Sequence, residues 1–377
     1  MQLQRQDMTE TGWRSLFSLD GLPNTKNWPD CLESLKQAFA CVDEQRSMAE
    51  MKAWQPVLVK AMQVLNLPAW SISQVISDHN DWIYRYTLRE SLAEMQRQGW
   101  GDPPCNFCVL TLGSGARHES LLGPDQDNAM IIDNYPDTRH NEIDTWFQTL
   151  GERFTDKLDI AGIPLCRGHV MARWPLWRKS LDQWRDQMHL WSRRRTVKLV
   201  QLSNILLDFY PVYGQTALAD KFRQTILELM PGAGLFLDEM NELQKETTVA
   251  LDRFDRLSSD GQDAPHQQAI NLKRQGLLPM QAALRLMALR NGVVAQDCKG
   301  RLTELSETGH LSADRAIALN DALEYLLSLL LDAQMEAVSL GRKPDGWVDK
   351  SRLAPHHRQQ LKMALIQIRE LQKLAAG

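Results

Sequence analysis

The sequence has little that would place the chain in a membrane or outside the cell. Its six cysteines are scattered, and only Cys105 and Cys108 form a C-x-x-C pair, with no second pair and no histidine at zinc spacing. We therefore expect core or strand-edge cysteines rather than a disulfide framework or a zinc site. The N-terminus has no apolar signal core, and the longest apolar run, near Tyr325 to Leu331, is far short of the ~20 residues that span a bilayer. These absences predict a cytoplasmic protein that does not enter membranes.

An excess of positive charge is also missing. The chain has 43 Lys and Arg residues against 47 Asp and Glu residues, a net charge of −4, whereas proteins that bind nucleic acid generally are usually basic. We therefore expect no nucleic-acid partner. The 377 residues are enough for two or three domains, and nothing in the sequence predicts an oligomeric state.

The most informative stretch lies between residues 107 and 132. Its parts are an apolar run, a Gly-Ser turn, a short polar segment, a Gly-Pro break and a second apolar run: Phe107 to Leu112, Gly113-Ser114, Gly115 to Ser120, Gly123-Pro124 and Ala129 to Ile132. This order predicts a strand, a tight turn, a short helix, a second turn and a second strand.

Two acidic residues, Asp125 and Asp127, open the second apolar run. In extended backbone their side chains share one face, ~6.6 Å apart along the chain, and Gln126 faces the other way. Two carboxylates at this spacing can share a hard cation, and Mg²⁺ prefers such ligands together with substrate phosphates. The alternative is that Asp125 is a turn residue and Asp127 a solvated strand end.

The Gly113-Ser114 turn precedes a short helix. Free backbone N–H groups and a hydroxyl at such a turn suit an anionic triphosphate, although Ser114 also fits a simple N-cap. Arg117 and Glu119 follow, either as contacts to the nucleotide or as a salt bridge that holds the short helix.

The G-S turn followed by D-x-D resembles the nucleotidyltransferase signature of the DNA polymerase β superfamily. The fuller string, G-S-x-x-R-x-E-x-x-L-x-x-D-Q-D-N, resembles a family of nucleotidyltransferases of bacterial signalling proteins, often fused to CBS or cyclic-nucleotide-binding domains and related to the PII-protein uridylyltransferase. Ala116 stands where this family more often has Gly. The resemblance extends over nearly all of the chain after about residue 45.

The resemblance implies a third carboxylate beside the D-x-D pair. Our candidate is Asp208, expected near the end of a helix from about Val197 to Tyr210, in a segment D-F-Y-P-V-Y-G that resembles the family's D-F-R-P-V-Y-G. Tyr210 replaces the usual Arg there. A buried Asp is costly unless it is paired or bound to metal, so an N-cap or a purely structural Asp is the competing interpretation.

The pattern of residues also gives expectations for two further segments of the core. The composition of Leu165 to Ala172 predicts a third strand, and the segment resembles the family's C-x-G-x-x-M-A. There are two interpretations of His169 in this strand: it lines the nucleotide pocket, or it is a hydrogen-bonded strand histidine. Pro175 is expected to start a helix. Residues on that helix at steps of four and three predict a packed stripe: Trp177, Leu181, Trp184, Met188 and Trp191.

The rest of the chain predicts helices. We expect an α+β, mostly helical protein with a helical leader (1–100), a small mixed-sheet nucleotidyltransferase core like that of DNA polymerase β (101–215) and a C-terminal helical bundle (216–377). That bundle resembles the family's substrate-binding domain. Lys273 and Arg285, with Arg274, are its cations to watch for phosphate contact, and surface salt bridges explain them nearly as well.

Taken together, the patterns and the resemblance imply a Mg²⁺-dependent enzyme that transfers NMP from an NTP to an acceptor hydroxyl by two-metal catalysis. Asp125 and Asp127 are expected to hold Mg²⁺ on the triphosphate, and Asp208 is expected to bind the second metal ion. The resemblance implies an acceptor side chain on a signalling protein. No histidine of the chain is followed by Asp, so the hydrolytic His-Asp motif of the PII uridylyltransferases is missing. The alternative is a non-catalytic module that binds a nucleotide and regulates. The nucleotide base is not predicted.

Overall fold

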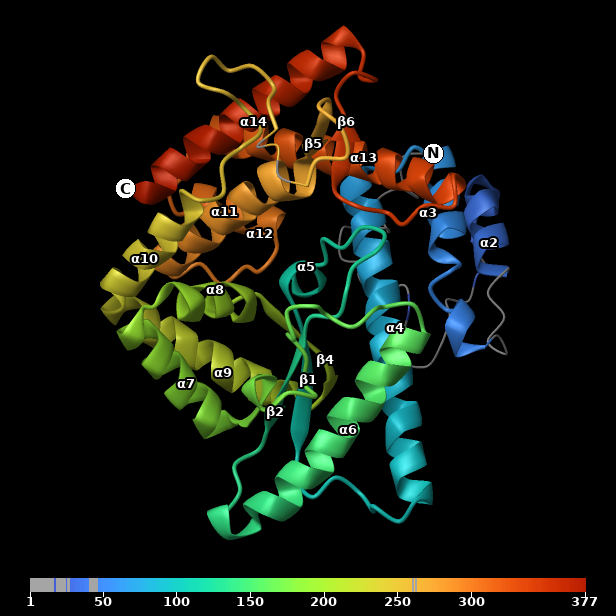
Figure 1. Ribbon diagram of the computed structural model, residues 1–377, viewed down its shortest axis with the longest axis vertical. Helices are drawn as coiled ribbons and strands as arrows, with labels where there is room; N and C mark the ends of the chain where they lie inside the picture. Colours follow the sequence, from blue (N-terminus) through green and yellow to red (C-terminus); the bar gives the residue numbers. More distant parts are fainter. Residues whose placement is uncertain (1–16, 18–24, 26–27, 41–46, 260, 262) are drawn as a thin grey trace. The chain divides into compact units, whose positions relative to one another are not determined.

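The computed structural model describes residues 17, 25, 28–40, 47–259, 261 and 263–377. They form two compact units (Figure 1). Unit 1 is drawn from residues 1–187 and 207–225, and unit 2 from residues 188–206 and 226–377. The chain is mostly helical with a small mixed sheet, which confirms the predicted fold class. The domain boundaries at residues 100 and 215 stay a prediction.

Unit 1 is built on a four-stranded sheet of order β3-β2-β1-β4. The strands are β1 (Phe107–Leu112), β2 (Asn128–Ile132), β3 (Arg178–Ser180) and β4 (Phe209–Gly214). The central strand β1 is antiparallel to both β2 and β4, whereas β3 runs parallel to β2. Every residue of β1 and β2 is buried, which explains why both read as continuous apolar runs rather than alternating ones. The expected strands on either side of the Gly-Ser turn are therefore confirmed.

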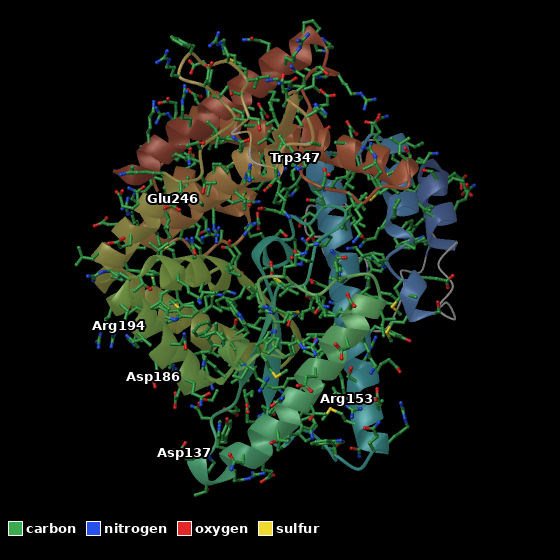
Figure 2. The ribbon with its side chains drawn as sticks, in the orientation of Figure 1. Asp137, Arg153, Asp186, Arg194, Glu246 and Trp347 are labelled. Atoms are coloured by element: carbon green, nitrogen blue, oxygen red, sulfur yellow. The ribbon has the colours of Figure 1, made fainter. Side chains whose placement is uncertain are left out.

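Helices surround this sheet. Those with residues in unit 1 are η1 (Asp30–Leu32), α2 (Glu33–Ala40), η2 (Met48–Glu50), α3 (Gln55–Val64), α4 (Ala69–Arg97), α5 (Gly113–Ala116), η3 (Asp137–Arg139), α6 (His140–Ile160), η4 (Pro175–Trp177), α7 (Leu181–Arg194) and α9 (Thr216–Leu229), the last two continuing into unit 2. The long helices α4 and α6 pack side by side (Figure 1). Arg153 of α6, labelled in Figure 2, lies 2.5 Å from Glu94 of α4, which Lys157 also contacts.

One predicted strand and one predicted helix start are wrong. Leu165 to Ala172 is irregular and contains a turn in which the N–H of His169 donates to the carbonyl of Cys166, with His169 at φ +58°. The strand β3 instead occupies residues for which we predicted a helix starting at Pro175. Pro175 opens only a short 3₁₀ turn, and α7 begins at Leu181. The tryptophan stripe is buried throughout, as predicted.

Unit 2 is a helical bundle. Its elements are α8 (Val197–Leu206), η5 (Met230–Gly232), α10 (Gly234–Gln244), β5 (Ala269–Asn271), η6 (Lys273–Leu277), α11 (Leu278–Asn291), α12 (Cys298–Glu307), α13 (Ala313–Ser339), β6 (Trp347–Asp349) and α14 (Pro355–Ala376). Helix α14 packs against α11 and α13, and the antiparallel β5–β6 pair is a small second sheet. That pair was not predicted, since the sequence led us to expect only helices there. Along the part of the chain that the structure describes, no helix is long and apolar enough to cross a bilayer.

Candidate active site

The sheet brings three segments that are distant in sequence to one end of β1. Since β2 and β4 both run antiparallel to β1, the residue before each of them lies beside the end of β1. Asp127 precedes β2, and its carbonyl accepts the N–H of Leu112 at 2.9 Å. Asp208 precedes β4, and its carbonyl accepts the N–H of Gly113 at 3.0 Å. The turn after β1 is therefore flanked by two acidic residues that the sequence places about 80 residues apart.

The turn requires glycine at its first position. Gly113 has φ +58°, a conformation that strains residues with a side chain, and a Cβ there would lie 3.7 Å from Oδ2 of Asp127. The one-turn helix α5 begins at Gly113 with Leu112 as its N-cap, so the alternative that Ser114 is the N-cap is wrong. Ser114 is half-buried inside this first turn, where leading N–H groups have no acceptor within the helix.

The D-Q-D-N segment alternates between outward and inward side chains. Asp125 is exposed and Asp127 half-exposed, whereas Gln126 and Asn128 are fully buried. The Nε2 of Gln126 donates to the carbonyls of Thr155 and Ile163 at 2.8 and 2.9 Å. Gln126 therefore faces away from both carboxylates, as predicted. It anchors the segment to the end of α6, so that the two acids lie at fixed positions.

Asn128 supplies a second anchor that sequence reasoning missed. Its Nδ2 donates to the Tyr84 hydroxyl of α4 at 3.3 Å, and its Oδ1 accepts the N–H of Ala172 at 2.8 Å. Burial raises the pKa of Tyr84, and the charge of Asp127 adds to the rise. The phenol therefore stays protonated next to the acidic segment.

Asp208 does not face solvent. Its carboxylate is fully buried, and Nη1 of Arg117 lies 2.5 Å from its Oδ2. The same guanidinium donates to Glu119 at 2.9 Å, and all three side chains are nearly inaccessible. The Arg117–Glu119 salt bridge, one of the two alternatives for these residues, is therefore present, and it includes Asp208. Helix α8 ends at Leu206, so Asp208 lies in the bend before β4 rather than in a helix.

The donor set fits a single Mg²⁺ better than a pair of metal ions. Among the residues that the structure describes, no three His, Cys, Asp or Glu side chains are grouped so as to hold a metal ion. Asp125 and Asp127 are the accessible carboxylates at this end of the sheet, since Asp208 is bound by Arg117. One or two carboxylates completed by water and substrate phosphates are a usual Mg²⁺ environment.

A lysine from the leader reaches the same place. Nζ of Lys52 lies 3.5 Å from the carbonyl of Pro124, the residue before Asp125. Burial lowers the pKa of Lys52 to about 8, and the charge of Asp125 opposes that shift. Sequence reasoning missed Lys52, because it lies more than 70 residues before the acidic pair in a segment without a motif.

The other predicted site residues are distributed more widely. His169 is exposed, and its ring meets Trp174 edge-on at 5.4 Å. In the same turn, burial and then the charge of Asp127 raise the pKa of Cys166 to about 11, which places the turn against that carboxylate. Lys273 and Arg285 belong to unit 2: Lys273 is exposed in η6, and Arg285 is buried in α11.

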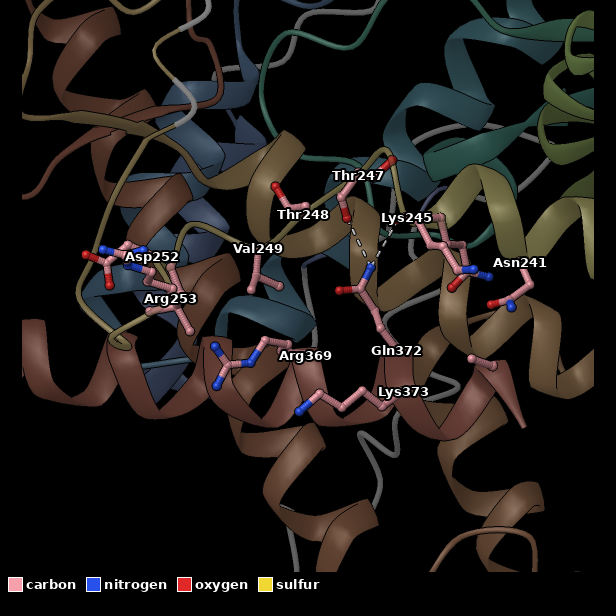
Figure 3. Close-up of a pocket in the computed structure, with 13 residues that line it drawn as sticks. Asn241, Lys245, Thr247, Thr248, Val249, Asp252, Arg253, Arg369, Gln372 and Lys373 are labelled. Carbon is pink, nitrogen blue, oxygen red and sulfur yellow. Dashed lines mark hydrogen bonds between the residues drawn. The ribbon is translucent and has the colours of Figure 1, made fainter.

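Unit 2 also contains a cavity of about 410 Å³ between the end of α10, the loop after it and α14 (Figure 3). Lys245, Arg253, Arg369 and Lys373 line it, and Gln372 bridges to the backbone of Thr247 at 3.0 Å. Three of these cations already contact carboxylates on the surface: Lys245 contacts Glu242, Arg369 contacts Asp255 and Lys373 contacts Glu370. None of the residues predicted for the site lines this cavity.

The sheet, the glycine turn and the paired acids define the chain as a nucleotidyltransferase-type domain with a helical companion. Comparison with known families agrees. Residues 53–198 match the family described as Putative nucleotidyltransferase DUF294, and residues 234–377 match the Putative nucleotidyltransferase substrate binding domain. The two matches cover more than three quarters of the chain, which therefore belongs to this nucleotidyltransferase family. Asp208 lies between the matched segments. A search of curated proteins finds no match.

Proposed function

We propose that the protein transfers a nucleoside monophosphate from an NTP to an acceptor hydroxyl on a protein, with Mg²⁺ bound by Asp125 and Asp127. The observation that carries the proposal is the convergence at the end of β1. There the Gly113 turn, which only a residue without a side chain fits well, lies against the carboxylate of Asp127. A triphosphate bound at this turn would meet the two accessible acids directly.

The chain's own residues provide position and charge. The N–H of Gly113 already donates to Asp208, so the N–H groups of α5 that follow it, together with the Ser114 hydroxyl, would orient the phosphates. The anchors at Gln126 and Asn128 would keep the acids aimed at them. A Mg²⁺ ion at the acids would neutralise phosphate charge and favour departure of pyrophosphate. Positioning and charge neutralisation account for most of the catalysis of phosphoryl and nucleotidyl transfer.

We infer two consecutive roles for Asp208. With no nucleotide bound, the carboxylate of Asp208 binds the guanidinium of Arg117. If Arg117 moves to the bound phosphates, the carboxylate of Asp208 is released as a third acid beside Asp127 and can accept the proton of the attacking hydroxyl. Nucleotide binding would then complete the site.

The acceptor is proposed from the family. Its second domain is described as substrate-binding, and the sequence string resembles relatives of the PII-protein uridylyltransferase. A tyrosine of a signalling protein is the acceptor that this resemblance favours. We further propose that this activity operates in the cytoplasm.

The test is transfer of label from α-³²P NTPs, each base in turn, to proteins of a lysate in the presence of Mg²⁺. Label on a protein band should be lost with Asp125→Asn/Asp127→Asn. It should be kept with Asp137→Asn/Asp186→Asn, a matched pair of exposed acids away from the turn (Figure 2). Equal labelling by both double variants would contradict the proposal.

A second candidate function is a regulatory module that binds a nucleotide without transferring it. The buried Arg117–Asp208 pair favours it, because Asp208, the candidate third carboxylate beside Asp127, is not presented to solvent. Calorimetric binding of NTPs by wild type, without label transfer to any acceptor, would support this second candidate.

A further inference from the structure

Lys52 occupies an unusual position for a lysine. It lies between η2 and α3, and its side chain reaches the acidic segment, where Nζ approaches the carbonyl of Pro124. Its stem packs on Gly162, where a Cβ would lie only 2.9 Å from the Cβ of Lys52. Gly162 also has φ +96°, so a residue without a side chain is needed there both for the backbone conformation and for the close approach of Lys52. Lys52 is therefore held in place beside Asp125.

Among the described residues, the ammonium group of Lys52 has no close carboxylate partner, whereas several other cations of unit 1 have one. Lys157 contacts Glu94 at 2.5 Å, Arg178 contacts Asp144 at 3.1 Å, and Arg117 contacts two carboxylates. For Lys52, no carboxylate of the described residues lies within 4 Å, and its single hydrogen bond, to a carbonyl, is long. Removing a cation from water without a close counter-charge is unfavourable. Such a position is typical of a group that an anionic ligand completes.

We propose that Lys52 binds the β- and γ-phosphates of the NTP and holds the pyrophosphate as it leaves. This inference rests on the proposed function. The turn at Gly113 lies against Asp127, and the side chain of Lys52 reaches the carbonyl of Pro124, the residue before Asp125. A triphosphate near both acids also meets the ammonium group, which offsets the repulsion between the carboxylates and the phosphates.

Lys52 assists the step in which the pyrophosphate leaves. The acceptor oxygen forms a bond to the α-phosphorus while the bond from that phosphorus to the bridging oxygen of the β-phosphate breaks. The electron pair of the broken bond leaves with the pyrophosphate. The proton of the acceptor hydroxyl passes to Asp208, the base proposed above, or to solvent. Lys52 donates hydrogen bonds to the oxygens on which negative charge grows, and it remains protonated throughout.

Binding measurements test the inference without relying on turnover. We would titrate the full chain, with Mg²⁺ present, with inorganic pyrophosphate, with an α,β-methylene NTP analogue and with the corresponding NMP. Lys52→Met keeps the stem on Gly162 and removes the charge. It should weaken binding of pyrophosphate and of the analogue about tenfold or more, as for a lost charged hydrogen bond, and leave NMP binding within about twofold. Lys52→Arg should restore part of the loss, and Lys60→Gln, an exposed lysine of α3, should match wild type.

The outcomes separate this inference from the proposed function. Unchanged pyrophosphate binding by Lys52→Met, or equal weakening of NMP binding, would overturn the role of Lys52 while label transfer by wild type still supports the enzyme. If Lys52→Met loses only pyrophosphate binding while wild type transfers no label, the role of Lys52 in phosphate binding is supported and the proposed transferase activity is contradicted. If Lys52→Met melts well below wild type, Lys52→Gln is measured in its place. Loss of folding in both variants would show that Lys52 is structural.

Discussion

Helix α4 contains a buried acid whose ionisation should control stability. Asp78 is 3% exposed, and its Oδ2 accepts the N–H of Phe17 at 2.7 Å. Burial raises the pKa of Asp78 to about 7, and the charge of Asp81 adds to the rise. The N–H of Phe17 and the charges of Arg85 and His118 oppose it. Phe17 is in turn held by Arg85, which donates to its carbonyl at 2.8 Å.

The sign of the effect follows from the two pKa values of Asp78. Between its unfolded pKa near 3.8 and its folded pKa near 7, the folded state keeps a proton that the unfolded chain has lost. Stability therefore falls as the pH rises through this window. A shift of about three pKa units corresponds to about 4 kcal/mol by pH 8, as an upper bound. Asp78→Asn removes this loss and keeps an oxygen that accepts the N–H of Phe17.

We expect Asp78→Asn to be more stable than wild type at pH 8, by up to about 4 kcal/mol, and the difference to shrink toward pH 5. Urea unfolding at pH 5, 6, 7 and 8, followed by tryptophan fluorescence, measures it. Burial lowers the pKa of His79 to about 3, so its protonation in acid destabilises both proteins. Because the effect is the same in both, it cancels in the difference between them. Asp137→Asn, on the surface, is the control. A difference that is the same at pH 5 and pH 8 would refute the reasoning.

Two further predictions concern the turn after β1. Arg117→Met removes the cation that contacts two buried carboxylates and should cost about 3–5 kcal/mol, measured by urea unfolding. Adding Asp208→Asn should recover part of the loss, and an Arg117→Met variant as stable as wild type would contradict a buried ion pair. Gly113→Ala imposes a left-handed conformation that costs about 1–2 kcal/mol and adds a methyl group 3.7 Å from Asp127. It should reduce label transfer at least tenfold. Gly99→Ala, at φ +82° in open space, should show a similar strain and full transfer.

The elements that the sequence predicted well are those whose pattern is local. β1 and β2 consist mostly of apolar residues and lie next to Gly and Pro breaks. The turn and the D-Q-D segment between the two strands are local as well. Their alternation, with Gln126 buried and Asp125 exposed, follows from the two-residue period of extended backbone.

The elements that were missed depend on contacts between distant residues. The segment around His169 has strand-like composition, but the N–H groups of Gln126 and Asn128 donate to its carbonyls at Pro164 and Val170 while its own backbone turns at Cys166. β3 has only three residues, too few for a periodic pattern, and it exists because it pairs with β2.

The same reasoning explains why the sequence gives an incomplete view of the charge around the site. Asp208 lies among apolar residues, which predicts burial, yet its partner Arg117 comes from a position 91 residues earlier. Lys52 reaches Pro124 across 72 residues. A sheet in which β2 and β4 both run antiparallel to β1 collects such residues at one end of that strand. The accessible acids and the buried Arg117–Asp208 pair are thus consequences of one topology, and Lys52 joins them from a segment outside the sheet. A triphosphate bound there would meet Lys52 directly. It would meet Arg117 only if the contact between Arg117 and Asp208 breaks.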